Sequence, residues 1–309
     1  MVRLGRAYRH PCLDEDAASK WSPLWQAYKI MPTLEDLHYA IKLKDGRKVR
    51  FLAEHSLINI NSSLRSCTAL SLSVYQKDID CVTALLDNGA NPNKLSRDWY
   101  GRIETPLFSA CRLGLHEIAR LLIEKGADVN STDFYNHSPL WISTRERDFK
   151  MVSLLIESGA NLNTADKWSQ CPLYLATKYL GRQQIAKMLI QHGCKLDVTD
   201  IEGHGVLYWA IANHQVEIAK LLITAGAHIG HRDRELLIGR SVPPSIRNDP
   251  DFRAWLLKNL NHPPSMLLAA TVQVRNQLCE ISDGKSIWKS IDQLALPEPV
   301  RNSLKFKDW

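Results

Sequence analysis

Cysteines and histidines are the residues of this sequence that could do nucleophilic or metal chemistry. The cysteines show no paired close spacing, and none has an obvious histidine partner of the kind that activates a nucleophile. Neither a cysteine nor a carboxylate completes a tetrahedral metal set around the one histidine cluster. No catalytic residue, metal or cofactor is therefore predicted, and the chain is not expected to be an enzyme. The residues concerned are Cys12, Cys67, Cys81, Cys111, Cys171, Cys194 and Cys279, with the histidine cluster His204, His214, His228 and His231.

The short motifs of common enzymes are also missing. The sequence has no Gly-x4-Gly-Lys-Ser/Thr phosphate loop and no His-Glu-x2-His zinc motif. Several aspartates recur at regular distances, but their setting is that of turn formers rather than of paired general acids and bases. These aspartates are Asp98, Asp133, Asp166 and Asp200.

Recognition of another protein is the chemistry that the remaining side chains can support. Three short stretches carry aromatic residues, two of them together with arginine or lysine, a composition that is typical of protein interfaces. The alternative is that these aromatic rings pack on neighbouring loops and serve only the fold. A second basic cluster, from Lys42 to Arg50, lacks aromatic stacking groups and a glycine-rich cradle, so we expect a solvated loop there. The candidate target-binding residues are Arg97, Trp99, Tyr100, Arg102, Phe134, Tyr135, Lys167 and Trp168.

The elements that position these residues are short helices in a repeated unit. Thr105 can cap a helix, and Pro106 suits its first position. Gly114 can end that helix in the left-handed conformation, and Gly126 can end the next. The glycine-led turn returns at steps of 37, 33, 34 and 33 residues, together with a Thr-Pro-Leu-like helix start. A helix pair this short cannot bury its apolar face alone, so the copies are expected to stack.

The Thr-Pro-Leu start, the Gly-Ala-Asp-Val-Asn turn and the period near 33 resemble the ankyrin repeat. The resemblance covers residues 32–232 in six copies. It implies an all-α solenoid of paired antiparallel helices with β-hairpin fingers between repeats. The aromatic and basic stretches then lie on fingers, and the 37-residue step places an insertion within residues 94–102. Ankyrin repeats usually make an inter-repeat hydrogen bond from a histidine after Thr-Pro-Leu. This bond is expected to be mostly absent, because that position holds Ser71, Phe108, Trp141, Tyr174 and Tyr208.

The two ends of the predicted stack carry different sequences. Residues 1–31 have no repeat signal, but Trp21, Trp25 and Tyr28 are spaced for one helical face. We expect them to belong to an N-terminal capping segment that covers the first repeat, with a partner-binding segment as the alternative. Residues 233–262 resemble a degenerate capping repeat that ends at a proline pair.

Residues 263–309 break the period and predict an amphipathic helix followed by two further apolar sets. This tail resembles a SOCS box, the three-helix module that ends the ankyrin repeat and SOCS box family and binds the elongin B/elongin C heterodimer. Its first helix matches the family motif at most positions, but Thr271 stands where arginine is common, and an alanine at position 270 replaces a cysteine and removes an apolar plug for elongin C. The implied elongin-binding residues are Ser265, Met266, Leu267, Ala270, Val274 and Leu278.

The family's cullin box, Leu-Pro-aliphatic-Pro, is similar to residues 294–297, with Ala295 in place of one proline. The resemblance implies a non-catalytic substrate-recognition adaptor of an elongin B/C–cullin-5 RING E3 ubiquitin ligase, which binds its target protein through the ankyrin stack. The alternative is a plain ankyrin-repeat scaffold whose tail only caps the last repeat, and it rests on the two alanine departures. The implied cullin-binding residues are Leu294, Leu296, Pro297 and Val300.

Composition agrees with a folded intracellular protein. Hydrophobic residues make up 45% of the 309 residues, so disorder is not expected. The net charge of +6 permits an acidic partner but does not demand nucleic acid. No run of 18 apolar residues predicts a membrane span, and the basic N-terminus lacks the apolar core of a signal peptide. Because the cysteines are not paired in sequence, we expect them to be reduced thiols in a cytoplasmic or nuclear protein.

Overall fold

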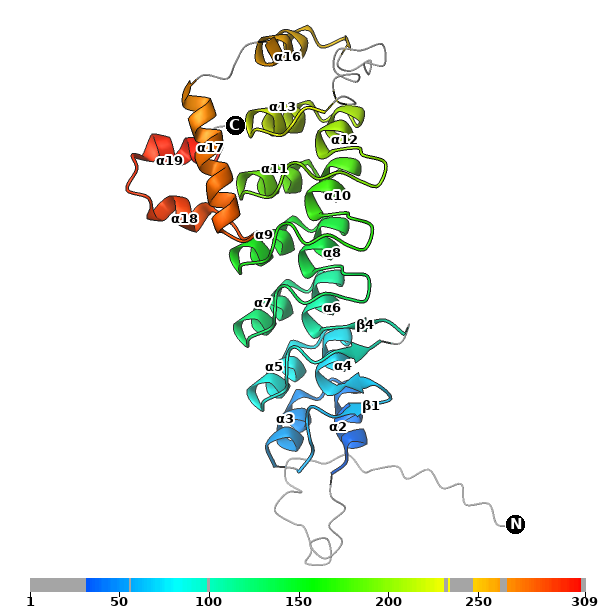
Figure 1. Ribbon diagram of the computed structural model, residues 1–309. Coiled ribbons are helices and arrows are strands. Elements are labelled where there is room, and N and C mark those ends of the chain that lie inside the picture. The colour runs from blue at the N-terminus through cyan, green and yellow to red at the C-terminus, as the bar shows by residue number, and fades with distance from the viewer. Residues whose placement is uncertain are drawn as a thin grey trace, which may run out of the picture.

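The computed structural model describes residues 32–55, 57–98, 101–230, 233, 247–261 and 266–306. Over this part the chain forms antiparallel helix pairs stacked side by side into a solenoid, as Figure 1 shows. The pairs are α2 (Leu34–Lys42) with α3 (Gly46–His55), α4 (Ala69–Tyr75) with α5 (Ile79–Asp87), α6 (Pro106–Arg112) with α7 (His116–Glu124), α8 (Pro139–Arg145) with α9 (Phe149–Glu157), α10 (Pro172–Lys178) with α11 (Gln183–Gln191), and α12 (Val206–Ala212) with α13 (Val216–Thr224). The chain continues with α16 (Pro250–Asn261), α17 (Met266–Ile281), α18 (Trp288–Gln293) and α19 (Glu298–Leu304).

The helix pairs begin and end where the sequence predicts. Thr105 Oγ1 accepts a hydrogen bond from the Phe108 N–H at 3.3 Å, and Pro106 occupies the first turn of α6. Each glycine after a second helix is left-handed, with φ between 83° and 92°, which favours glycine because it has no side chain. These glycines are Gly89, Gly126, Gly159, Gly193 and Gly226.

Apolar contacts and an asparagine ladder hold the pairs in register. One leucine from every first helix is at most 2% exposed in a core that runs along the whole stack. Between turns, Asn93 Oδ1 accepts from the Asp128 N–H at 2.7 Å, while its Nδ2 donates to the Gly126 oxygen at 3.0 Å. Asn61 makes the same pair of bonds one repeat earlier. The core leucines are Leu37, Leu70, Leu107, Leu140, Leu173 and Leu207.

Two aromatic residues at the usual histidine position restore an inter-repeat hydrogen bond. Trp141 Nε1 donates to the Gln170 oxygen at 3.0 Å. The Tyr174 hydroxyl donates to Asp200 Oδ2 at 3.0 Å. The histidine bond itself is absent from these two repeats, and the aromatic residues replace it with hydrogen bonds of their own, because an indole N–H and a phenol hydroxyl both reach the next finger.

Paired strands form in the first two fingers of the described chain, and a single antiparallel bridge joins Thr199 and Gly205 in the last finger. β1 (Ser63–Leu64) pairs with β2 (Cys67–Thr68), and β3 (Ser96–Arg97) pairs with β4 (Ile103–Glu104) across the predicted insertion. The later fingers are tight turns instead. One carboxylate oxygen in each accepts from the amides two and four residues later, at 2.8–2.9 Å. The aspartates Asp133, Asp166 and Asp200 are turn formers, as predicted. The β-hairpin expectation was wrong for the fingers of Asp133 and Asp166, whereas the Asp200 finger keeps one antiparallel bridge.

At the C-terminal end, α16 covers the last helix pair. Phe252 and Leu256 are 0% and 1% exposed and join the core of the stack. Of residues 233–262, for which the sequence predicts a degenerate capping repeat, 233 and 247–261 are described. The predicted capping segment 1–31 lies outside the described residues. Among the helices that the structure describes, none is long and apolar enough to cross a membrane.

Candidate functional site

Four of the predicted target-binding residues come together on two neighbouring fingers. Phe134 and Tyr135 lie on the 133–137 turn, and Lys167 and Trp168 lie on the next. The Tyr135 and Trp168 rings stack with their centroids 5.7 Å apart. Lys167 Nζ lies 3.6 Å from the centroid of Phe134, and its backbone N–H donates to the Tyr135 oxygen at 3.1 Å. The two fingers thus present one aromatic surface, which we call the finger surface.

The rings of the finger surface face solvent. Phe134 is 73% exposed, Tyr135 47% and Trp168 49%. The alternative that these rings pack on neighbouring fingers is correct for the stacked Tyr135 and Trp168, yet about half of each residue stays accessible. An exposed cation–π contact is worth only about 0.5–1 kcal/mol, so a partner can displace Lys167 from Phe134 at small cost.

Carboxylates hold the arginine of the enlarged β3–β4 finger in place. Arg102 Nη2 lies 2.6 Å from Asp98 Oδ2, and its Nε lies 3.5 Å from Glu104 Oε1. Glu104 also pairs with Arg112 at 3.0 Å. Arg102 therefore stiffens this finger as well as facing solvent. Arg97 is exposed on β3, while the predicted Trp99 and Tyr100 lie outside the described residues.

The described cysteines are poor nucleophiles. Burial raises the pKa of the Cys81 and Cys111 thiols to about 12 and holds that of Cys194 well above its usual value. Thiols of this kind stay protonated at neutral pH. Within the described ranges, no group of three or more His, Cys, Asp or Glu side chains could hold a metal ion.

The tail is the second candidate surface, and a buried arginine fixes it to the stack. Helices α17–α19 lie beside the edge formed by α9, α11 and α13 (Figure 1). Arg275 of α17 is 2% exposed and lies 4.7 Å from the Phe306 ring centroid. Its guanidinium donates to the Leu304 oxygen at 2.8 Å, to the Gln191 oxygen at 3.3 Å and also to the Ile190 oxygen. The last carbonyl groups of a helix have no hydrogen-bond donor within that helix. At the end of α11, the Arg275 guanidinium is the donor to two of these oxygens.

Helix α18 adds an aromatic contact at the same helix end. Trp288 Nε1 donates to the Gln191 oxygen at 3.0 Å, and the Trp288 ring stacks on His192 with centroids 4.0 Å apart. His192 Nδ1 lies 2.6 Å from Ser286 Oγ. The C-terminus of α11 is therefore the main attachment point of the tail.

The tail also touches the repeats on either side of α11. The Gly284 oxygen accepts a hydrogen bond of 2.8 Å from the Leu162 N–H, in the turn after α9. Val272 lies over Gly226, in the turn after α13, where an added Cβ would come 2.5 Å from Val272 Cγ1. The tail thus bridges three successive repeats.

Part of the apolar surface of the tail is packed and part is exposed. Leu278 and Leu296 are half-buried against a small core of the tail's own, a structural role that the family motifs alone do not indicate. Val274, Ile281 and Val300 are instead 38%, 78% and 40% exposed. Ile281 lies beyond Leu278, the last residue of the matched motif, so the motif does not predict it as a binding residue. The small core consists of Ile287, Ile291 and Leu304.

The other predicted tail residues differ in exposure. Ala270 and Pro297 are exposed, and Leu294 is half-buried. Met266 and Leu267 begin α17, but their side chains lie outside the described part of the structure, as does the whole of Ser265. Among the described side chains of α17, Ala270, Val274 and Ile281 are exposed apolar groups that lie along one side of the helix.

Stacked helix pairs with asparagine-linked turns define the class of this protein. Models of the ankyrin repeat match residues 65–97, 94–166 and 160–233, which together cover more than half of the chain. The chain therefore belongs to the ankyrin-repeat proteins. The matched residues end before the tail begins.

Relatives and solved structures share the repeats. Inversin of Mus musculus is 30% identical over 177 residues, which is 57% of this chain and 16% of inversin. Ankyrin repeat and SOCS box protein 11 of Danio rerio is 38% identical over 106 residues, 34% of each chain. The present chain thus matches only a minor part of these relatives. A crystallised ankyrin repeat domain from Acinetobacter baumannii AYE has a TM-score of 0.56 at 28% identity, covering 62% of this chain and 98% of that domain.

Docking of the tail is expected to weaken in mild acid, because a buried histidine sits at its attachment point. The pKa of His192 is lowered from 6.5 to about 4, mainly by burial and to a smaller extent by the charges of Arg275 and Lys305. A detached tail leaves this ring hydrated, so the detached form binds more protons between those two pKa values. Docking is fully stable above pH 6.5 and loses about 2 kcal/mol by about pH 5.

Melting curves at about pH 7.5 and pH 5 check this expectation. A His192→Phe variant keeps an aromatic ring against Trp288 but cannot be protonated. It should lose less stability than the parent chain over the same interval. Equal losses in both proteins would contradict the assignment to His192.

Proposed function

We propose that this chain is a non-catalytic target-recognition subunit of an elongin B/C–cullin-5 RING ubiquitin ligase, acting in the cytoplasm or nucleus. The ankyrin stack binds the target protein through the finger surface. The tail acts as a SOCS box and joins the stack to the ligase. Ubiquitin transfer is then a proximity effect, and the bond-forming chemistry belongs to the conjugating enzyme on the RING partner.

One observation carries the proposal. The tail has its own small core, and α17 keeps exposed apolar residues, of which Val274 stands at a position where the SOCS-box motif expects an elongin contact and Ile281 lies just beyond the motif. Val274 and Ile281 are exposed on a helix that the buried Arg275 fixes to the stack. A tail that merely capped the stack has no need of these exposed residues. The match to a protein named for ankyrin repeats and a SOCS box adds support, although it covers only 106 residues.

Co-expression with elongins B and C tests the proposal. The full chain should co-purify with both elongins at micromolar concentration. Val274→Asp places a charge among the exposed apolar residues of α17 and should weaken elongin binding about tenfold or more, since an apolar contact is replaced by a desolvated carboxylate. Asn276→Asp on the same helix adds the same charge beside the groove between α17 and α13, and should leave elongin binding unchanged.

The alternative function, a plain ankyrin-repeat scaffold, is favoured by the alanines at positions 270 and 295 and by the firm attachment of the tail. If the full chain is soluble but does not co-purify with elongins B and C, the scaffold function is supported and the ligase proposal is wrong. Deletion of the tail does not discriminate between the two functions. Because the tail contacts three repeats, its loss lowers stability in both cases.

A pull-down from cells under proteasome inhibition addresses the target-binding half of the proposal. Phe134→Ala/Trp168→Ala removes the two most exposed large rings of the finger surface without touching the core. Proteins that bind the parent chain but not this variant are targets of the finger surface. If the parent chain and the variant capture the same proteins, target binding does not depend on the finger surface and another part of the stack must bind the target.

A further inference from the structure

The fingers of four successive repeats share one turn, so their tips can be compared position by position. In each turn the N–H of a leading aspartate donates to the backbone oxygen four residues later, at 2.9–3.2 Å. The fingers follow one another along the side of the stack that carries the first helices (Figure 1). Equivalent tip residues therefore stand one repeat apart. The leading aspartates are Asp98, Asp133, Asp166 and Asp200.

The last of these fingers continues the finger surface with an apolar side chain. Ile201 stands at the tip position that Phe134 and Lys167 occupy in the two preceding fingers, and it is 86% exposed. A single exposed apolar residue is ordinary on a protein surface. Here Phe134, Trp168 and Ile201 expose large apolar side chains on three consecutive fingers. A chain segment that lies across Phe134 and Trp168 meets Ile201 one repeat further along.

The first two fingers present basic side chains instead. Arg65 lies at the tip of the β1–β2 finger and Arg97 lies on β3, and both are exposed. The Arg97 N–H donates to the Ser66 oxygen at 2.9 Å, so the two arginines belong to adjoining fingers. Among the described residues, no carboxylate pairs with either guanidinium. Both charges are therefore available to a partner.

The carboxylates that lead the finger turns point inward. Asp98 and Asp166 are 8% and 6% exposed, and they accept hydrogen bonds from backbone N–H groups of their own turns. Glu202 differs, because its side chain is 70% exposed next to Ile201. The surface is thus basic on the first two fingers, aromatic on the next two, and apolar with one free-standing carboxylate side chain on the last.

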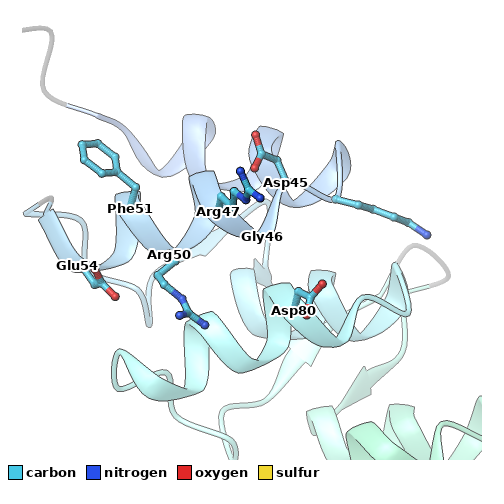
Figure 2. Close-up of a pocket in the computed structure, with 8 residues that line it drawn as sticks. Asp45, Gly46, Arg47, Arg50, Phe51, Glu54 and Asp80 are labelled. Carbon is cyan, nitrogen blue, oxygen red and sulfur yellow. The ribbon is translucent and has the colours of Figure 1, made fainter. Parts of the chain in front are cut away.

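The basic residues near α3 do not form a comparable surface. Figure 2 shows Arg47 and Arg50 in a pocket that is also lined by Asp45, Glu54 and Asp80. Opposite charges compensate one another there, so this pocket gives an acidic segment little net attraction. The first two fingers differ, because the carboxylates among them are buried in turns and ion pairs.

We propose that the target segment on this surface is an extended polypeptide with acidic residues over Arg65 and Arg97 and apolar residues over Phe134, Trp168 and Ile201. The inference rests on the proposed target binding by the finger surface, and it adds the class of target. The reverse placement is disfavoured, because Glu202 repels acidic residues at the last finger. Neighbouring repeats lie about 10 Å apart, so the four steps from Arg65 to Ile201 span about 12 extended residues.

Selection of displayed random peptides, about 16 residues long, on the full chain tests the class of target. Enriched peptides should carry aspartate or glutamate in one half and large apolar residues in the other. On Arg65→Gln/Arg97→Gln, the acidic half should no longer be enriched. The affinity of a peptide selected on the parent chain should fall about threefold to tenfold in this variant, because two exposed ion pairs are lost.

Two further variants make the result specific. Ile201→Ser should weaken the same peptide about threefold to tenfold, because an apolar contact is lost at the other end of the segment. Arg120→Gln is the matched control, since it removes an exposed positive charge from α7, away from the fingers. It should change neither the enriched composition nor the affinity. All of these residues are exposed, so the fold survives the substitutions.

Several outcomes would overturn the proposed class of target. They are enrichment of peptides without an acidic half, enrichment of no peptide at all, and tighter binding of a single-stranded DNA of about 12 nucleotides than of the selected peptides. Proteins captured from cells separate this failure from failure of the proposed function. If their capture still depends on Phe134 and Trp168, only the class of target is wrong. If it does not, target binding by the finger surface is itself wrong.

Discussion

Replacing Arg275 with methionine is expected to release the tail and destabilise repeats four to six. The side chain is almost fully buried and donates to three carbonyl oxygens, two of them at the end of α11. Hydrogen bonds from a charged donor contribute about 1.5–3 kcal/mol each, and methionine fills the space without replacing them. We expect a loss of about 2–4 kcal/mol in the free energy of unfolding, measured by urea denaturation.

Two further variants separate charge from geometry. Arg275→Lys keeps the charge but cannot fork between carbonyls, so its stability should lie between those of the parent and the methionine variant. Arg120→Met, on the exposed side of α7, should change stability by less than about 0.5 kcal/mol. If Arg275→Met were more stable than the parent, burying the charge would outweigh its hydrogen bonds, and Arg275 would not be the anchor of the tail.

Gly226→Ala is expected to destabilise the protein much more than Gly126→Ala. Both glycines are left-handed, with φ of 92° and 86°, so an alanine costs about 1–2 kcal/mol at either position. They differ in what lies over them. A Cβ at Gly226 meets Val272 of the tail, whereas a Cβ at Gly126 has nothing within 4 Å.

The difference between these two variants therefore measures the contact between tail and stack. Overpacking of this kind typically costs about 1–3 kcal/mol, which we expect as the additional loss for Gly226→Ala. Amides of α17 should also exchange faster in that variant. Equal stability of the two variants would mean that Val272 moves aside freely and that the contact after α13 is unimportant for docking.

The repeat architecture could be predicted because its determinants are local. The capping hydroxyl of Thr105, the proline beside it and the left-handed Gly126 each act on their own few residues, and their regular return sets the stacking. The inter-repeat hydrogen bonds were harder to predict. Trp141 and Tyr174 occupy a histidine position with different chemistry, and only the distance to the next finger shows that their polar atoms reach it.

The candidate surfaces were predictable to different degrees. Phe134, Tyr135, Lys167 and Trp168 were predicted as a group because their fingers follow one another at the repeat period. The burial of Arg275 was not, because a motif match gives no information on the distant carbonyls of α11. For the same reason, the sequence could not separate the packed Leu278 from the exposed Val274, which stand one helical turn apart.

The bridge made by the tail has a consequence for how the protein comes apart. In a linear repeat array each unit touches only its neighbours, so unzipping can begin at either end and stop at any unit. Contacts at Leu162, Gln191 and Gly226 connect the fourth, fifth and sixth units through one element, so these units should melt as a block. The first three units lack this brace and should fray before the block melts. Lys167 and Trp168 follow Leu162 closely in sequence. Their half of the finger surface therefore lies next to the block of three units that unfolds last.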